Sequence, residues 1–352
     1  GQHFTLYPGQ QYQEYFDRLC AGGRQEDIPV GDILNSLGID FDKAEVYAQA
    51  SIGQVYRVET NARELAVKIR YTGVEKRIST DFKVLKTLLW PVKFTPLKNN
   101  ALIPLLENLQ EAFLEECDYE KEARVQDSFS RLFGKENTVF VPELVAYNKK
   151  AIVSNWVKGR TLTDAKVGVG AWFIDTYLHF VIKSLKHLKM LHADPHPGNF
   201  LLVGGTSGSD GQAKMPEQLA VIDFGSVVHF SSEEAEAALR LLLGDYLHED
   251  EMILDLMTLG LKEETVEAYR PVISDLAVIL LEPFYHPGCY DFFNWRLQYK
   301  INTILSSKTW ERPLAIPLKL LLLLRTLQGI YYYARVNFVS FNWQEAVRKY
   351  MR

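Results

Sequence analysis

The sequence predicts an α+β protein with two lobes, a small β-rich N-terminal lobe and a mainly helical C-terminal lobe. Its 352 residues can fill more than one hydrophobic core. Short β-rich runs are concentrated in residues 45–157, whereas longer helical patterns are concentrated in residues 158–352. We therefore expect a first lobe over 45–157, a second lobe over 158–352 and a helical extension over 1–44.

The first 44 residues contain two short helical patterns, residues 10–21 and 30–37, and the second ends at Gly38. The pattern then changes to that of strands. Three β-rich runs joined by short turns predict an antiparallel meander. These runs are residues 46–50, 55–60 and 65–70.

One long helix and two more strands complete the predicted first lobe. Apolar residues at intervals of three and four, among them Leu109 and Phe113, predict a helix over residues 104–133. The two strands are expected at residues 139–146 and 151–157.

Helices dominate the predicted second lobe, with a strand pair between the first two of them. The strands, 199–203 and 219–222, are joined by a Gly-, Ser- and Asp-rich loop over residues 204–212. The helices are expected at residues 172–191, 233–247, 251–259, 264–281 and 314–336.

The Leu-rich segment 314–336 is the one stretch that could be taken for a membrane span. It is interrupted by Pro317, Lys319, Arg325, Gln328 and Arg335. Charges at a bilayer centre cost about 2.5–3.5 kcal/mol each. A buried helix is therefore predicted.

Composition and charge exclude several classes of protein. The chain is 47% hydrophobic and 24% charged, as in globular proteins, and its net charge of −5 argues against a broad basic surface for nucleic acid. Three cysteines without a Cys-x-x-Cys pair indicate neither a disulfide framework nor a zinc ribbon, and they fit a reducing, cytoplasmic compartment. The sequence has no signal-peptide layout and no initiator Met, so an organellar targeting segment could be missing from it.

The sharpest motif is His192 to Asn199, followed by Asp223 of an Asp-Phe-Gly sequence. In kinases a catalytic-loop Asp is followed five residues later by a metal-binding Asn, and the Asp of Asp-Phe-Gly binds the second metal. Asp194 and Asn199 have this spacing. We therefore expect Asp194 to orient or deprotonate the nucleophile, and Asn199 and Asp223 to place Mg²⁺ beside phosphate oxygens.

Two other interpretations of these residues exist. Each motif alone could be an ordinary tight loop or a turn at a strand end. A zinc site made by His192, Asp194 and His196 is also conceivable, because alternate residues of an extended segment share a face. Pro195 and Pro197 disfavour a regular strand, however, and no fourth ligand cluster stands out.

A small-residue turn between the first two predicted strands has the position of a phosphate-binding loop. Ala48 and Ala50 stand at the first two glycine positions of Gly-x-Gly-x-x-Gly, and Ser51 and Gly53 follow them. Small side chains allow close backbone approach, although Cβ atoms restrict positive φ. Alone, this turn is weak evidence, because Ala-rich turns are common.

Lys68 lies fifteen residues after Gly53 on the third predicted strand, from which a kinase lysine reaches the α and β phosphates. Such a lysine needs an acidic partner in the following helix. The alternative is an exposed lysine opposite a solvated acidic helix face. The candidate partners are Glu116, Asp118, Glu120 and Glu122.

Five motifs, in order, resemble the UbiB/ADCK/AarF family of atypical kinases, and the resemblance covers about residues 45–230. The resemblance implies a bilobal protein-kinase-like fold and binding of ATP with Mg²⁺. It also implies that Lys68 pairs with Glu122. The motifs are residues 48–55, 66–69, 116–123, 192–199 and 221–225.

The same resemblance implies that Glu116 and Asp118 form a Glu-x-Asp element, which engages the lysine of an N-terminal Lys-x-Gly-Gln motif. This chain opens with Gly1-Gln2, which could be the end of that motif. We assign to the nucleotide site Ala48, Ala50, Ser51, Gly53, Lys68, Asn155, Val157, Glu116 and Asp118.

By resemblance, the activity is closer to an ATPase than to a protein kinase, and it supports isoprenoid quinone (ubiquinone-type) biosynthesis or related lipid metabolism. Membrane lipids, quinone-pathway intermediates or enzymes are the implied partners, with peripheral membrane association. The aromatic stripe of residues 172–191 is more typical of a core helix than of a membrane-surface helix. The alternatives are a small-molecule kinase of aminoglycoside or choline type and a catalytically silent pseudokinase scaffold.

Overall fold

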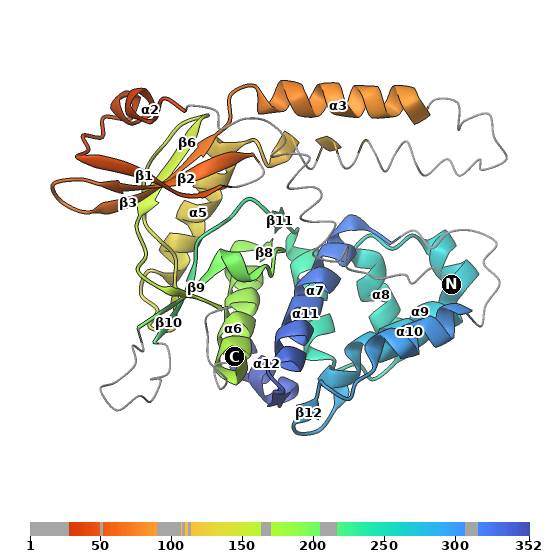
Figure 1. Ribbon diagram of the computed structural model, residues 1–352. Helices are drawn as coiled ribbons and strands as arrows, with labels where there is room; N and C mark the ends of the chain where they lie inside the picture. Colours follow the sequence, from red (N-terminus) through yellow and green to blue (C-terminus); the bar gives the residue numbers. More distant parts are fainter. Residues whose placement is uncertain are drawn as a thin grey trace. The chain divides into compact units, whose positions relative to one another are not determined.

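The computed structural model describes residues 28–49, 52–89, 107, 110–111, 114–162, 170–204, 217–306 and 316–352 (Figure 1). The chain divides into two compact units. The first consists of Gly1–Asp127 with Pro142–Val157, and the second of Ser128–Val141 with Lys158–Arg352.

The first unit contains a five-stranded antiparallel sheet of order β1-β2-β3-β6-β5. The predicted meander β1-β2-β3 is confirmed, and so is the short helix α2 before it. The bounds are α2 Val30–Ser36, β1 Lys43–Gln49, β2 Gly53–Glu59, β3 Glu64–Arg70, β5 Leu144–Tyr147 and β6 Ala151–Asn155.

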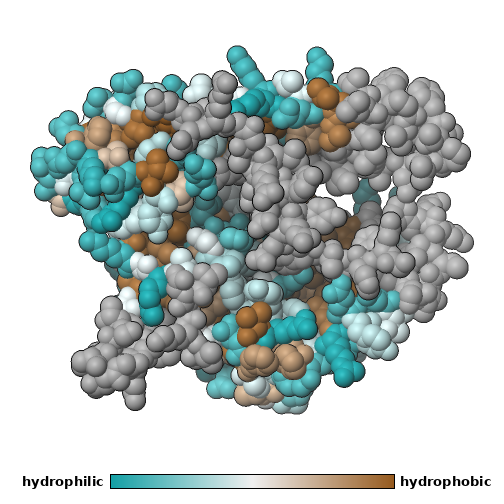
Figure 2. Space-filling view, in the orientation of Figure 1, coloured by the Kyte–Doolittle hydropathy of each residue, from teal (hydrophilic) through white to brown (hydrophobic). Residues whose placement is uncertain are grey.

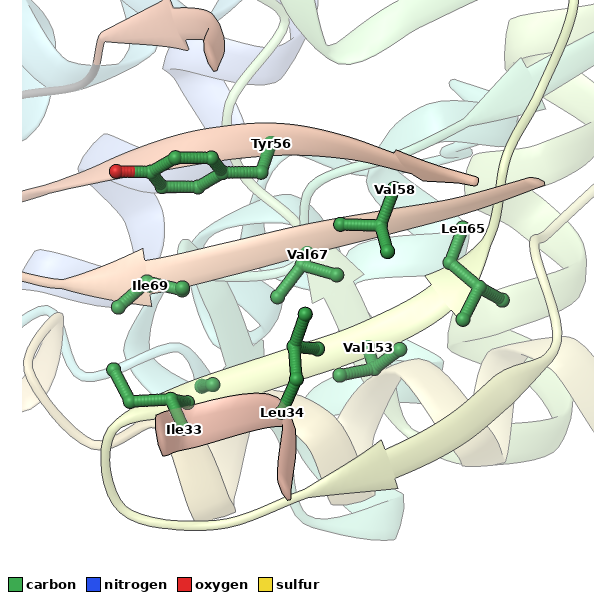
Figure 3. Close-up of a cluster of buried hydrophobic side chains, with 9 residues drawn as sticks. Ile33, Leu34, Tyr56, Val58, Leu65, Val67, Ile69 and Val153 are labelled. Atoms are coloured by element: carbon green, nitrogen blue, oxygen red, sulfur yellow. The ribbon is translucent and has the colours of Figure 1, made fainter. Parts of the chain in front are cut away.

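Alternation along β2 and β3 builds the core of this unit. In β3, Leu65, Val67 and Ile69 are fully or almost fully buried, because every second side chain of a strand points to the same face. Ile33 and Leu34 of α2 pack against that face (Figure 3). Helix α2 covers this side of the sheet and leaves the intervening side chains of β3, including Lys68, on the other.

The helices of the first unit differ from the sequence-based expectation. The pattern over 104–133 predicts one helix, but the chain turns at Glu116–Asp118 and α5 begins afterwards, at Tyr119–Phe133. The cause is Asp118, whose Oδ1 accepts the backbone N–H of Lys121 at 2.9 Å and caps the helix. Helix α3, Val74–Leu89, is an additional helix that was not predicted. The predicted helix 10–21 lies outside the described residues.

The second unit contains a four-stranded sheet of order β4-β10-β9-β7, a pair β11-β8 and a pair β12-β13. The predicted strands 199–203 and 219–222 correspond to β9 and β10, which pair antiparallel. The bounds are β4 Val139–Phe140, β7 Arg160–Thr161, β8 Met190–His192, β9 Phe200–Val203, β10 Gln218–Val221, β11 Val227–His229, β12 Tyr290–Asp291 and β13 Ser340–Phe341.

The single strand predicted over 139–146 is wrong. Residues 139–140 form β4, which pairs in parallel with β10 in the second unit, whereas β5 belongs to the sheet of the first. Pro142 lies between them and has no N–H to donate to a ladder. The strand therefore ends before it.

Helices make up most of the second unit, and the five predicted helices are present. Helices α10 and α12 are additional, as is the short 3₁₀ helix η3. The bounds are α6 Gly170–Leu188, η3 Pro197–Asn199, α7 Ser232–Leu243, α8 Glu249–Thr258, α9 Glu263–Tyr285, α10 Leu297–Ser306, α11 Leu318–Val336 and α12 Trp343–Met351.

Helix α6 is the centre of the helical unit, where α7, α11 and α12 contact it (Figure 1). Its aromatic residues Phe173, Tyr177 and Phe180 are buried, so its stripe is core and not a membrane-facing surface. In α11, Leu323, Ile330 and other residues of one face are buried. Among the described helices, none is long and apolar enough to cross a bilayer. On the face of the molecule drawn in Figure 2, hydrophilic side chains cover much of the described surface, with apolar side chains between them.

Candidate functional site

Lys68 of β3 forms an ion pair with Glu122 of α5, and the Nζ–Oε1 distance is 2.7 Å. Both groups are largely withdrawn from water, since the Lys68 side chain is 19% exposed and that of Glu122 is 7% exposed. The ammonium group also lies 5.4 Å from the centroid of the buried Tyr119 ring. A lysine held in this way presents a fixed positive charge on the first unit.

Gly53, the first residue of β2, allows three elements to come together beside this pair. A Cβ at this position would lie 2.3 Å from the carbonyl oxygen of Ile69 and 2.8 Å from Oη of Tyr119. Only glycine fits such a close approach. Of the other loop residues, Ala48 is exposed in β1, opposite Val55 and beside a register shift, whereas residues 50–51 lie outside the described residues.

The remaining residues assigned to the nucleotide site in the first unit have structural contacts. Asp118 caps α5, and Glu116 lies in the turn before it. Asn155 accepts a hydrogen bond from Arg63 at 3.0 Å and donates one to Glu143 at 3.3 Å. Val157 follows β6 and is partly buried. Asn155, the last residue of β6, thus bonds to two neighbouring segments and Asp118 caps α5, and a role of either residue toward nucleotide stays a prediction.

In the second unit, His192 holds the segment that carries Asp223. His192 is 1% exposed, and its Nε2 lies 2.8 Å from the backbone carbonyl oxygen of Asp223. Because a carbonyl can only accept, Nε2 is the protonated nitrogen. Burial lowers the pKa of His192, so the imidazole is neutral. Its ring contacts that of Phe224 edge-on, and Phe224 in turn packs against Phe129.

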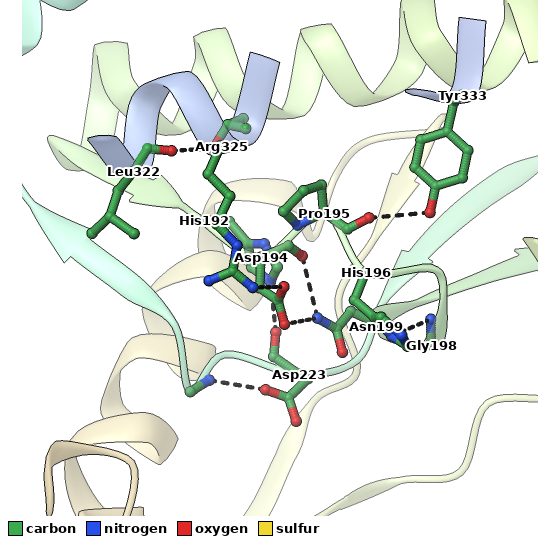
Figure 4. Close-up of polar contacts among 12 residues, drawn as sticks. His192, Asp194, Pro195, His196, Gly198, Asn199, Asp223, Leu322, Arg325 and Tyr333 are labelled. Atoms are coloured by element: carbon green, nitrogen blue, oxygen red, sulfur yellow. Dashed lines mark hydrogen bonds and ion pairs between the residues drawn. The ribbon is translucent and has the colours of Figure 1, made fainter. Parts of the chain in front are cut away.

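Asp194, Asn199 and Asp223 are brought together by the ends of β8 and β10 (Figure 4). The side-chain nitrogen of Asn199 donates to the carboxylate of Asp194 at 2.9 Å and to its carbonyl oxygen at 3.2 Å. The backbone carbonyl of Asn199 accepts a hydrogen bond from the backbone N–H of Ile222, the residue before Asp223, at 3.0 Å. Asp223 accepts the N–H of Gly225 at 3.0 Å. Backbone bonds thus hold both expected metal ligands at one place.

The donor atoms of this group suit Mg²⁺. Since the nitrogen of Asn199 is used by Asp194, the amide oxygen is the atom that Asn199 can offer to a cation. A carboxylate from Asp223 and an amide oxygen from Asn199 are hard oxygen ligands, and Mg²⁺ typically adds water and phosphate oxygens to one or two protein ligands.

The zinc interpretation of this loop finds no support in the geometry. His192 faces Asp223, whereas Nδ1 of His196 accepts the N–H of Gly198 at 3.1 Å within its own turn. In the ranges that the structure describes, no group of three or more His, Cys, Asp or Glu side chains could hold a metal ion.

Arg325 of α11 is a site residue that the sequence analysis missed. Its Nη2 lies 2.5 Å from Oδ1 of Asp194. The two residues are 131 positions apart in the chain. The sequence signal was the presence of an arginine in the Leu-rich segment, which identifies a charge but no partner.

A model of the ABC1 atypical kinase-like domain matches residues 35–257, more than half of the chain. The chain belongs to the ABC1 atypical kinase-like family. This family includes the aarF- and COQ8-type proteins named below. The match therefore confirms the resemblance expected from the sequence. Lys68, Glu122, Asp194, Asn199 and Asp223 fall inside the matched ABC1 region, whereas Arg325 lies outside it.

Two relatives in the ABC1 family and one solved structure illustrate the similarity. A chloroplastic aarF domain-containing protein kinase of Arabidopsis thaliana, itself uncharacterised, is 30% identical over 255 residues, 68% of this chain and 34% of that protein. The mitochondrial atypical kinase COQ-8 of Caenorhabditis elegans is 26% identical over 239 residues, 66% of this chain and 30% of that protein. The chain thus spans about a third of the length of these relatives.

Rv3197 of Mycobacterium tuberculosis, solved in complex with erythromycin, has a TM-score of 0.64 and 20% identity, covering 97% of this chain and 88% of that one. This likeness concerns the fold. Together with the ABC1 match, it confirms the α+β, protein-kinase-like fold expected from the sequence.

Proposed function

We propose that this ABC1-family protein binds ATP with Mg²⁺ and transfers its terminal phosphoryl group, with water as an acceptor. The observation that carries the proposal is the ion pair between Lys68 and Glu122, because kinases require this lysine-glutamate pair for activity. Lys68 would contact the α and β phosphates.

In the second unit, Asp194 would orient the attacking water and accept its proton. The water oxygen forms a bond to the γ-phosphorus, the bond from that phosphorus to the β–γ bridging oxygen breaks, and ADP leaves. Asn199 and Asp223 would hold Mg²⁺, which when bound neutralises charge on the phosphate oxygens. The hydrogen bonds to Asp194 and Asp223 hold both carboxylates in place. Such preorganisation supports catalysis by positioning and electrostatics.

The biological role that we propose is support of isoprenoid quinone biosynthesis or related membrane lipid metabolism. It rests on family membership and on relatives such as the mitochondrial atypical kinase COQ-8. Contact with a membrane would be peripheral.

Phosphate release from Mg-ATP tests the proposal, measured with and without liposomes and with a phenolic quinone-precursor mimic. Slow hydrolysis that lipid or phenol accelerates, and that Asp194→Asn lowers to a small but measurable residual rate, is the expected result. Binding of Mg-ATP without turnover under every condition would favour a pseudokinase scaffold. Phosphorylation of the phenol itself would replace water by a small-molecule acceptor.

A further inference from the structure

Helix α11 contacts the loop of residues 192–199 through one stripe of three residues spaced four apart, Arg325, Gly329 and Tyr333. Figure 4 shows Arg325 and Tyr333 beside this loop. A Cβ at Gly329 would lie 2.2 Å from Cβ of Pro195, so the absence of a side chain lets this proline ring lie against the helix. The hydroxyl of the buried Tyr333 donates to the carbonyl oxygen of Pro195 at 3.1 Å. Helix α11 thus holds the loop of residues 192–199 in place through contacts with Pro195.

The stripe ends on Asp194 itself. Arg325 contacts Oδ1 of Asp194 at 2.5 Å, and Asn199 donates to Oδ2 at 2.9 Å. Among the described residues, Oδ1 and Oδ2 of Asp194 each have a donor, and the two donors come from different elements. This pair of contacts fixes both the position and the plane of the carboxylate.

The loop has no cation of its own. Between Asp194 and Asn199 the sequence is Pro-His-Pro-Gly, without Lys or Arg. The positive charge beside Asp194 comes from α11, and it lies at the group proposed to receive the proton.

We propose that Arg325 is a positioning residue that holds the carboxylate of Asp194 in the orientation needed for phosphoryl transfer. This inference rests on the proposed function and adds to it the part played by α11. A merely structural ion pair is the competing explanation. The side chain of Arg325 is 46% exposed, and exposed pairs contribute little to stability. The effect of losing it should therefore appear in the rate and not in the fold.

The test compares wild type with Arg325→Met, Arg325→Lys and Arg325→Ala, and with Arg335→Met as the matched control. Arg335 is exposed on the same helix. Thermal unfolding, Mg-ATP affinity and steady-state phosphate release are measured for each. We expect Arg325→Met to lower kcat by about 10- to 100-fold, because small displacements of a catalytic group have effects of this size. KM for ATP should stay within about twofold, and the melting temperature within about 4 °C.

Three results would separate positioning from structure. Arg325→Lys should recover part of kcat, and low-millimolar guanidinium should increase kcat of Arg325→Ala but not of Arg335→Met. In an Asp194→Asn background, Arg325→Met should cause no further loss, because the arginine acts through Asp194.

The outcomes for Arg325 and for the proposed function are distinct. Wild-type turnover with an unchanged or increased kcat in Arg325→Met would overturn the role of Arg325 and leave the ATPase in place. An equal loss in the Asp194→Asn background, or no recovery with guanidinium, would do the same. Absence of Mg-ATP binding or turnover in wild type would overturn both.

Discussion

The side-chain amide nitrogen of Asn199 donates hydrogen bonds to two oxygens of Asp194, the carboxylate Oδ2 at 2.9 Å and the backbone carbonyl at 3.2 Å. This double contact ties the proposed metal ligand to the proposed base and orients the amide oxygen of Asn199 away from Asp194. The two functions of the motif are therefore linked by direct hydrogen bonds between Asp194 and Asn199, the last residue of η3.

Asn199→Asp separates these functions. The variant keeps an oxygen ligand but removes the donor and places a second carboxylate beside Asp194. Hydrogen bonds to charged groups are worth about 1.5–3 kcal/mol, so we expect kcat to fall about 10-fold or more. Asn199→Ala, which removes both functions, should also lose Mg²⁺ dependence of binding. Wild-type kcat in Asn199→Asp, measured by phosphate release, would refute the link.

Lys68→Met should weaken ATP binding and retain the fold. It should also lower stability by about 1–3 kcal/mol, because it removes the cation from a buried Glu122 carboxylate. The double variant Lys68→Met with Glu122→Gln should regain part of that stability but none of the affinity. Denaturant unfolding and ATP titration together measure both effects. Equal free energies of unfolding for Lys68→Met and wild type would show that the Lys68–Glu122 ion pair makes no net contribution to stability.

Gly53→Ala should destabilise the first unit by about 1–3 kcal/mol, since the new Cβ would contact backbone at Ile69 and not a movable side chain. Gly31→Ala is the matched control. A Cβ at Gly31 would lie at an ordinary van der Waals distance of 3.7 Å from the Phe41 ring. Gly31 is in α2, and alanine is favoured over glycine in a helix by about 1 kcal/mol. Denaturant unfolding that ranks the two variants in the opposite order would contradict the packing described beside Lys68.

His179 of α6 should make stability decrease toward acid pH. Burial lowers its pKa, partly opposed by the carboxylate of Glu136 at 3.8 Å. His179 takes up a proton at about pH 6.5 in the unfolded chain, and only at lower pH in the folded protein. The unfolded state then binds more protons, so stability is complete above this pH and is lost as pH falls toward the folded pKa.

Melting temperatures between about pH 8 and 5.5 check this sign. His179→Gln should show a shallower decrease than wild type. His187→Gln, an exposed position on the same helix, should follow wild type. Equal slopes for His179→Gln and wild type would remove His179 from the explanation.

The sequence was sufficient for elements whose pattern is local. The meander, α6 and the strand pair β9-β10 follow from strand runs, helical spacing and the intervening turn. The sequence also placed Lys68, Asp194, Asn199 and Asp223 by spacing alone. Their catalytic and metal-binding roles, like the lobe limits 45–157 and 158–352, remain predictions.

Where the sequence analysis failed, tertiary contacts or single residues decided the structure. The cap at Asp118 ends a helical pattern that otherwise continues across it, and Pro142 separates two strands that belong to different units. Arg325 reaches Asp194 from a helix 131 residues away, and no periodicity encodes such a contact.

Isothermal titration of ATP in the presence and absence of Mg²⁺, for wild type and Asp223→Asn, tests the central claim most directly. We expect Mg²⁺-dependent binding in wild type and the loss of that dependence in Asp223→Asn, with both proteins equally folded by circular dichroism. Unchanged Mg-ATP affinity in the folded variant would contradict the assignment of Asp223 as the metal ligand, and no binding by wild type would contradict the proposed function.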